Sequence, residues 1–253
     1  MFALERQKRI MELLNSDGAV LVSKLSSELG VTDETVRRDL EKLESKELLR
    51  RTHGGALPMD EGSYELSLEK RKSINVEVKQ ALARKAVQHI ASGDSVFLDA
   101  STTTFYMAKE IKNMKNVTVI TNSIRVINEL SGVEGIKLIA IGGMVSNNQS
   151  FVGAMAENSI TENYFADKMF FSSRGIGDNA IILESNEQEC FIKQRMLKNS
   201  RTHYYLCDKT KIGRVGYMRL SSFEDIDYLV IDDDVTGKLK ETLDEFNVEV
   251  IRV

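Results

Sequence analysis

The chain has 253 residues and carries 34 Lys and Arg against 38 Asp and Glu, a formal net charge of -4 at pH 7. This mildly acidic balance excludes a protein that binds nucleic acid over its whole surface, so any such contact has to come from a local patch. The two cysteines are too few for a disulfide framework, and we see no apolar leader and no uncharged apolar run of about 18 residues. We therefore expect a cytoplasmic protein without a membrane span.

The only proline, Pro58, follows a Gly-Gly pair and precedes a charged stretch, which is typical of a domain boundary. Residues 1–58 hold ten Lys and Arg and ten Asp and Glu, so the whole net negative charge belongs to the remainder. We expect a small first domain over residues 1–58, a linker over 59–74 and a larger second domain over 75–253.

Apolar residues in the first domain recur at helical spacing in three segments. We expect helices over residues 4–18, 22–30 and 32–46. Residues 47–57 are too short and too rich in glycine for a fourth helix, and a two-stranded hairpin that turns at the Gly-Gly pair is the better prediction.

The third expected helix carries positive charge on one face. At 100° per residue Val36, Leu40 and Leu43 form an apolar stripe, whereas Arg38 and Lys42 lie on the opposite face. This predicts a helix-turn-helix whose third helix enters the major groove of DNA, where Arg bonds guanine, while the hairpin offers cations to phosphates or to the minor groove. The residues predicted to contact DNA are Thr32, Thr35, Arg37, Arg38, Lys42, Arg50, Arg51, His53 and Gly54.

The charge pattern leaves an alternative open at this point. Acidic residues in the same helix cancel its positive charge, so a solvated amphipathic helix fits the spacing as well. These acidic residues are Asp33, Glu34, Asp39, Glu41 and Glu44.

The same segment resembles a known DNA-binding family over about 50 residues. Thr32, two further residues and the run "TVRRDL" at 35–40 match the N-terminal signature of the DeoR family of bacterial transcription regulators, and the His-Gly-Gly after the hairpin arginines matches as well. The resemblance implies a winged helix-turn-helix with double-stranded operator DNA as its partner. It also implies that Asp39 pairs with an arginine instead of contacting a base.

Apolar strands alternate with helical segments throughout the second domain. This order predicts a Rossmann-like α/β fold, in which helices cover both faces of a parallel sheet. The expected strands are residues 95–100, 117–122, 136–143, 167–173, 203–208, 227–232 and 248–253. The expected helices are residues 103–111, 123–131, 156–165, 189–200 and 235–246.

Polar residues follow several of these strands. Asp99 ends one strand and could accept hydrogen bonds from sugar hydroxyls, and the hydroxyl residues after it begin a helix, whose free N–H groups favour an anion. Asn122 and Ser123 stand at a similar junction, and ligands bind at the carboxyl ends of strands in such sheets. A plain capping cluster is the alternative. Lys211 is a candidate phosphate counter-ion, or otherwise a surface lysine. No spacing fits a metal site, and we expect no cofactor.

Residues 75–253 also resemble the DeoR-family C-terminal sensor domain, which is similar to ribose-5-phosphate isomerase and to glucosamine-6-phosphate deaminase-type folds. The stretches "GDSVFLDASTT", "VITNS", "ADKMFFSSRGI" and "CDKTKIGR" carry this resemblance, although many members have glycine at the position of Ser101. In that family the domain binds phosphorylated sugars or related metabolites and drives oligomerisation. The variant "LDAST" resembles most the branch that senses 6-deoxyhexulose 1-phosphates. The residues carried over as effector-binding are Asp99, Ser101, Thr102, Thr103, Asn122, Ser123, Gly175, Asp208 and Lys211.

These observations predict a DNA-binding transcriptional regulator: a homo-oligomeric repressor, dimeric or tetrameric, of a sugar-catabolism operon that is relieved by a phosphorylated sugar. One alternative is a sugar-phosphate isomerase or deaminase with Asp99, Glu187 or Asp208 as its base. That alternative leaves the first 58 residues without a role. Another is a DNA-bound activator or architectural protein without a ligand.

Overall fold

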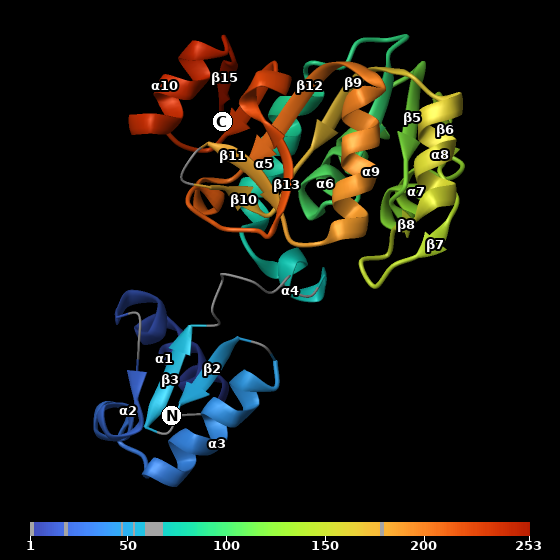
Figure 1. The fold of residues 1–253 in the computed structure, drawn as a ribbon. Coiled ribbons are helices and arrows are strands. Elements are labelled where there is room, and N and C mark those ends of the chain that lie inside the picture. Colours follow the sequence, from blue (N-terminus) through green and yellow to red (C-terminus); the bar gives the residue numbers. More distant parts are fainter. Residues whose placement is uncertain (1–2, 18–19, 47, 53, 59–67, 178–179) are drawn as a thin grey trace. The chain divides into compact units, whose positions relative to one another are not determined.

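The computed structural model describes residues 3–17, 20–46, 48–52, 54–58, 68–177 and 180–253 (Figure 1). Contacts divide the chain into two compact units, Met1–Tyr64 and Glu65–Val253. His53, one of the predicted DNA contacts, lies outside the described residues. No helix in the described part of the chain has the length and hydrophobicity needed to cross a lipid bilayer.

The first unit is a winged helix-turn-helix, as the sequence predicts. Gly30 ends the second helix in the left-handed conformation, at φ 64°, which costs glycine little. The core of the unit contains Leu14, Leu25, Val36 and Leu40. The strands form an antiparallel sheet in the order β1-β3-β2. The elements are α1 (Ala3–Asp17), β1 (Val20–Leu21), α2 (Val22–Leu29), α3 (Asp33–Glu44), β2 (Leu49–Thr52) and β3 (Gly55–Pro58).

Asp39 on α3 is buried and pairs with an arginine, Arg6 of α1. Its second oxygen accepts a hydrogen bond from Gln7 Nε2 at 3.2 Å. Removing one member of such a buried pair leaves the other charge buried without a partner, which is costly. These contacts therefore hold α3 against α1. The acidic charge of Asp39 is therefore directed into the unit, away from the outer face of α3.

Gly55 is required for the packing of the wing. A Cβ at this position would lie 1.9 Å from the backbone oxygen of Val20, on the neighbouring strand β1. At Gly54, by contrast, an added Cβ would meet no atom within 4 Å. The two glycines of the pair therefore have different structural constraints.

We predict that Gly55→Ala destabilises the first unit by about 3 kcal/mol, because the added methyl group forces β1 and β3 apart. Gly54→Ala is the matched control and should leave stability within about 0.5 kcal/mol of the parent. Amide hydrogen exchange of peptides from the first unit, measured on the full chain, separates the two. Equal protection in both variants would show that the close approach to Val20 is absent.

The second unit is built on seven parallel strands in the order β15-β14-β12-β9-β4-β5-β6. All seven strands expected from the sequence take part, so the Rossmann-like prediction is confirmed. The strands are β4 (Ser95–Leu98), β5 (Val117–Thr121), β6 (Ile136–Ala140), β9 (Ala166–Phe171), β12 (Ser200–Cys207), β14 (Tyr228–Ile231) and β15 (Glu249–Arg252).

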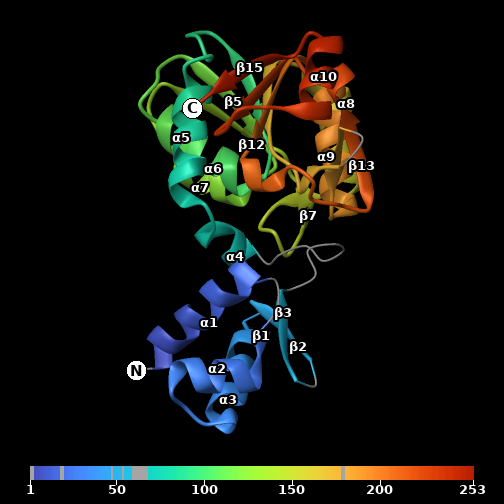
Figure 2. The same ribbon diagram turned by 90° about the vertical axis from the view of Figure 1, so that its left-hand side faces the viewer.

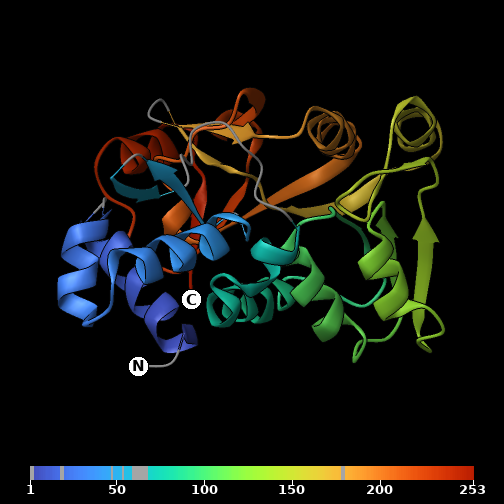
Figure 3. The same cartoon turned by 90° about the horizontal axis from the view of Figure 1, so that it is seen from below.

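Helices cover both faces of this sheet, α5–α7 on one side and α8–α10 on the other (Figures 2 and 3). Each layer buries its own apolar cluster, one around Leu98 and Met107 and the other around Met169 and Ile192. The helices are α5 (Val76–Val87), α6 (Thr102–Ile111), α7 (Ile124–Leu130), α8 (Ala154–Asn163), α9 (Glu187–Lys198) and α10 (Gly237–Glu245).

The helix α5 was not expected from the sequence, and neither were several short elements. The strand β11 pairs antiparallel with β10 and β13, and β7 forms a hairpin with β8. Two-residue strands carry no readable alternation, which is why the pattern missed most of them. These elements are β7 (Met144–Val145), β8 (Phe151–Val152), β10 (Gly175–Ile176), β11 (Ile181–Glu184), β13 (Met218–Ser222) and the 3-10 turns at Lys209–Lys211 and Phe223–Asp225.

The linker expected over residues 59–74 differs from the structure at its C-terminal end. Residues Leu68–Ser73 form a short helix, α4, which belongs to the second unit. The sequence "LEKRKS" gives no helical pattern of apolar residues, because Leu68 is the one buried side chain of this helix. Residues 59–67 lie outside the described part of the chain.

Candidate DNA-binding surface and effector pocket

The N-terminus of α3 presents two threonine hydroxyls. Thr32 caps the helix, since its Oγ1 accepts a hydrogen bond from the backbone N–H of Thr35 at 3.3 Å. The two hydroxyl oxygens lie 2.9 Å apart. This cap fixes the first turn of α3, which is the part of a recognition helix that reaches base edges.

The cations of α3 point into solvent. Arg37, Arg38 and Lys42 are all exposed, and the Arg38 side chain keeps 73% of its surface. Arg38 Nε lies 3.4 Å from Oε1 of Glu34, one turn earlier. An exposed pair of this kind is worth only tenths of a kcal/mol, so phosphates or bases can replace Glu34 as the partner of Arg38.

The wing adds two further exposed cations, Arg50 and Arg51, on β2. The backbone N–H of Arg51 donates to Glu44 Oε1 at 2.9 Å, which ties the wing to the end of α3. The structure thus brings the described DNA-contact candidates together on α3 and the adjoining wing.

The second unit contains a pocket at the carboxyl ends of three neighbouring strands, β4, β9 and β12. Its lining is strongly charged. The cations are Arg71, Lys79, Arg174, Lys193, Lys211 and Arg214, and the carboxylates are Glu184 and Asp208.

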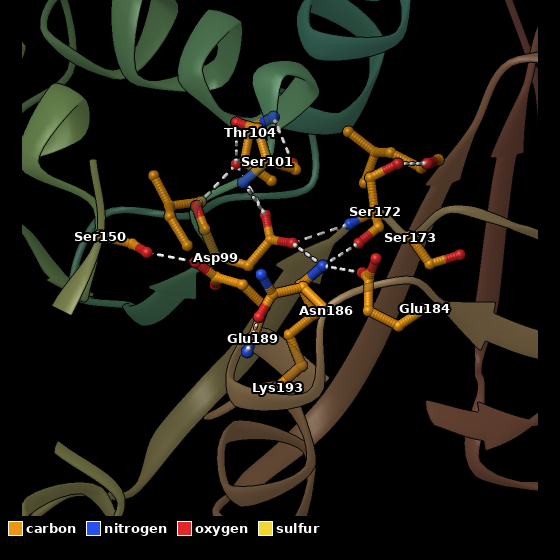
Figure 4. Close-up of polar contacts among 12 residues, drawn as sticks. Asp99, Ser101, Thr104, Ser150, Ser172, Ser173, Glu184, Asn186, Glu189 and Lys193 are labelled. Carbon is orange, nitrogen blue, oxygen red and sulfur yellow. Dashed lines mark hydrogen bonds and ion pairs between the residues drawn. The ribbon is translucent and has the colours of Figure 1, made fainter. Parts of the chain in front are cut away.

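Asp99 is fully buried and is surrounded by protein donors (Figure 4). Its Oδ1 accepts hydrogen bonds from the Ser101 N–H at 3.1 Å and from Thr104 Oγ1 at 2.8 Å. Its Oδ2 accepts from the Ser172 N–H at 3.2 Å and lies 3.3 Å from Lys193 Nζ. The prediction that Asp99 receives sugar hydroxyls does not fit these contacts, because its acceptor positions are already used within the protein.

Lys193 on α9 lines the pocket, and its ammonium group lies among Asp99, Ser172 and Glu184 (Figure 4). It is 5% exposed, pairs with Glu184 and Asp99, and donates to the Ser172 carbonyl at 2.9 Å. Burial by itself lowers the pKa of Lys193, but the carboxylates of Glu184, Asp99 and Glu189 raise it above its usual value overall. Lys193 is therefore a permanent, internally compensated cation.

A smaller polar pocket adjoins the first and is lined in part by Arg71, Asn148 and Glu189. Burial raises the pKa of Glu189 above its usual value, and its carboxyl group accepts a hydrogen bond from Ser150. A carboxyl group with a raised pKa, a hydroxyl and an amide are groups that select sugar hydroxyls by hydrogen bonding.

The first turn of α6 supplies the loop predicted for phosphate. Ser101 caps the helix by accepting from the Thr104 N–H at 3.2 Å, so the capping prediction holds. Ser101 and Thr102 line the pocket, whereas Thr103 is buried outside the lining. The N–H groups in the first turn of a helix have no carbonyl of their own to pair with, which suits them to an anion.

Three other predicted residues have supporting positions. Asn122 is buried and donates to the Phe151 carbonyl at 3.0 Å, and Ser123 caps α7. Neither is among the pocket residues. Gly175 lies beneath the loop 211–214, where a Cβ would approach the Lys211 carbonyl oxygen to 2.7 Å. Gly175 therefore sets the position of the loop that carries Lys211.

Asp208 and Lys211, both predicted, line the pocket and influence each other's charge. Burial disfavours a charged Asp208, but the charge of Lys211 and hydrogen bonds from Thr210 and Asn75 hold the pKa of Asp208 below its usual value. Burial also lowers the pKa of Lys211, which donates to Ser172 Oγ at 2.6 Å.

Lys79 on α5 is a further pocket cation that the sequence did not reveal. It is 4% exposed and donates to the carbonyl oxygens of Arg71 and Ile74, at 2.5 and 2.7 Å. Burial, reinforced by the charge of Lys211, lowers the pKa of Lys79 to about 8. The signal was a lysine on an otherwise apolar helix face, next to Leu82 and Ala83. Lys193 likewise lies on the buried face of α9, together with Glu189 one turn earlier.

We predict that anion binding in this pocket weakens as pH rises through about 8, because Lys79 then loses its charge. An anion that raises the pKa of Lys79 by about one unit binds about tenfold less tightly to the neutral form. Sulfate is the probe, since its own charge is constant from pH 7 to 9, and its dissociation constant is measured across that range. Lys79→Met should flatten the pH dependence. An unchanged pH dependence in that variant would assign the titration to another group, such as Lys211.

Among the described residues, no group of three or more His, Cys, Asp or Glu side chains could hold a metal ion. The polar groups of the pocket are mainly cations and hydroxyls, which suit a negatively charged organic ligand.

Comparison with known proteins identifies both units. Residues 6–61 match the family description "DeoR-like helix-turn-helix domain", and residues 74–233 match "DeoR C terminal sensor domain". The solved structures that resemble the chain include a ribose 5-phosphate isomerase A from Methanocaldococcus jannaschii, with 15% identity and a TM-score of 0.42 over 55% of each chain.

Relatives in sequence span the whole chain. The HTH-type transcriptional regulator YulB of Bacillus subtilis is 37% identical over 100% of this chain and 98% of its own. A putative aga operon transcriptional repressor of Escherichia coli O157:H7 is 33% identical, covering 98% and 93%. An L-fucose operon activator of Haemophilus influenzae is 31% identical, covering 97% and 98%. These relatives are regulators, not isomerases or deaminases, and the chain belongs to the DeoR family of DNA-binding transcriptional regulators.

Proposed function

We propose that this protein represses a sugar-catabolism operon and leaves its operator DNA when a phosphorylated sugar occupies the pocket of the second unit. The observation that carries this proposal is the pocket lining, in which six cationic side chains face two carboxylates. Such an excess of positive charge favours a phosphate dianion, and the neighbouring polar pocket with Asn148 and Glu189 offers hydrogen bonds to hydroxyls.

The relatives support a role in sugar metabolism. Their names refer to the aga operon, to the lactose phosphotransferase system and to the L-fucose operon. The fucose relative fits the proposal that the effector is a 6-deoxyhexulose 1-phosphate. Because that relative is an activator, the sign of regulation is tested by a reporter gene behind the operator, with and without the protein. Because a repressor acts on DNA, we also propose that the protein works in the cytoplasm.

We further propose that the protein binds DNA as a homo-oligomer, a dimer or a tetramer. A single recognition helix reads only a few base pairs, and paired helices on half-sites about one helical turn apart give the usual specificity. Sedimentation of the protein with and without operator DNA measures this state.

We predict that Arg38→Ala weakens operator binding by about 1–3 kcal/mol, because Arg38 reads a base edge from the exposed face of α3. Lys42→Ala should weaken binding less and lower the salt dependence by about one phosphate contact. Lys240→Ala is the control, since Lys240 is an exposed lysine on α10 and its loss changes the net charge equally. Fluorescence anisotropy on DNA upstream of the operon measures all three. If the Arg38→Ala and Lys240→Ala variants bind the operator equally well, Arg38 does not contact a base and the assignment of α3 as the recognition helix is contradicted.

We predict that a phosphorylated sugar raises thermal stability whereas its unphosphorylated form does not. A ligand at 100 times its dissociation constant contributes about 2.7 kcal/mol. A thermal shift scan that includes 6-deoxyhexulose 1-phosphates identifies the effector. Lys211→Met should weaken its binding at least about tenfold, because the pocket loses a counter-ion. Lys209→Met, two residues away and outside the pocket lining, should bind as the parent does. Equal binding by the two variants would contradict the site.

A further inference from the structure

The helix α4 contributes a side chain to the pocket and precedes the rest of the second unit in sequence. It is the first described element of the second unit, and residues 59–67 separate it from the wing in sequence. Its Arg71 lines both pockets, and Arg71 Nη2 donates to Asn148 Oδ1 at 2.6 Å. One side chain of α4 therefore lies where the effector is proposed to bind.

The C-terminal end of α4 is held by the pocket cation Lys79. Both carbonyls that accept from Lys79 Nζ, those of Arg71 and Ile74, lie in or just after the last turn of α4. A cation at a helix C-terminus satisfies carbonyls that have no partner within the helix. Whatever fixes the position and charge of Lys79 also fixes the end of α4.

A third contact anchors the corner between α4 and α5. Asn75 occupies the left-handed conformation there, at φ 51°, and its Nδ2 donates to Asp208 Oδ1 at 3.1 Å and to Thr210 Oγ1 at 3.2 Å. Asp208 and Thr210 belong to the pocket lining. These hydrogen bonds therefore tie the corner between α4 and α5 to the loop that carries Lys211.

α4 has little stability of its own. It has six residues, far below the length of about 12–15 at which an isolated helix becomes stable in water. Leu68 is its one buried side chain, so polar contacts with the pocket supply much of what holds it. If such a helix can also leave its place, a ligand that binds the docked helix better than the undocked one shifts the population toward the docked state.

We propose that α4 is the element through which the pocket controls the first unit: an anion bound by Arg71 and Lys79 favours the docked helix, and docking alters the chain that leads to the DNA-binding unit so that operator affinity falls. This inference rests on the proposed function. It adds the route of regulation, and it predicts that effector binding and loss of DNA binding can be separated by weakening α4 alone.

The test is hydrogen exchange of residues 68–75 in the full chain, with and without sulfate as the anion probe. Sulfate should slow exchange of this segment in the parent at least about fivefold. Leu68→Ala removes the apolar anchor without touching a pocket side chain, and should abolish that protection. Leu239→Ala, an equally buried leucine on α10, controls for a cavity elsewhere in the unit and should behave as the parent.

Operator affinity supplies the second readout. The bound effector should lower the operator affinity of the parent and of Leu239→Ala by a factor in the usual range of about 5–150, and that of Leu68→Ala by less than about twofold. If an anion binds but leaves exchange of residues 68–75 unchanged, or if Leu68→Ala keeps the full response, the role of α4 is overturned while the effector site stands. If neither sulfate nor any phosphorylated sugar binds, the inference and the proposed function both fall.

Discussion

The chemistry of the pocket in the second unit depends on how the charges of its buried lysines are balanced. Lys193 is compensated within the protein, because Glu184 and Asp99 lie against its ammonium group. Lys79 is just as buried, but its ammonium group donates to two backbone carbonyls, those of Arg71 and Ile74. Burying a charge is costly, so burial, together with the charge of Lys211, lowers the pKa of Lys79 to about 8 although the carboxylate of Asp208 acts to raise it. The pocket is thus arranged to gain free energy when an anion enters.

The difference between the balanced charge of Lys193 and the less balanced charge of Lys79 separates the roles of the residues in and beside the pocket. Asp99, which looks from the sequence like a ligand-binding carboxylate, positions Lys193 and the first turn of α6 instead. Burial lowers the pKa of both Lys79 and Lys211, and an anion beside them would favour their charged forms. Lys79 also donates to carbonyls at the end of α4, so the proposed effector site and the proposed regulatory helix share this one charged group.

Much of the fold was predictable from local pattern. The seven strands of the parallel sheet are apolar runs between helical segments, and the recognition helix shows an apolar stripe opposite Arg38 and Lys42. The candidate site was less predictable, because its main cations come from helix faces far apart in sequence. Neither Lys79 nor Lys193 lies in a loop or a motif. A lysine on a buried helix face is unusual, but only the fold shows that each of these lysines reaches the pocket. The short helix α4 was not predicted for a related reason, since its stability comes from tertiary contacts and not from its own sequence.

The most direct test of the central claim is calorimetry of anion binding at pH 8 in two buffers that differ in ionisation enthalpy. If Lys79 is a buried, partly deprotonated lysine that awaits an anion, sulfate or a phosphorylated sugar binds with net uptake of protons, and Lys79→Met abolishes most of that uptake. Binding without proton uptake in the parent protein would show that the pocket holds no such uncompensated charge, and would contradict the account.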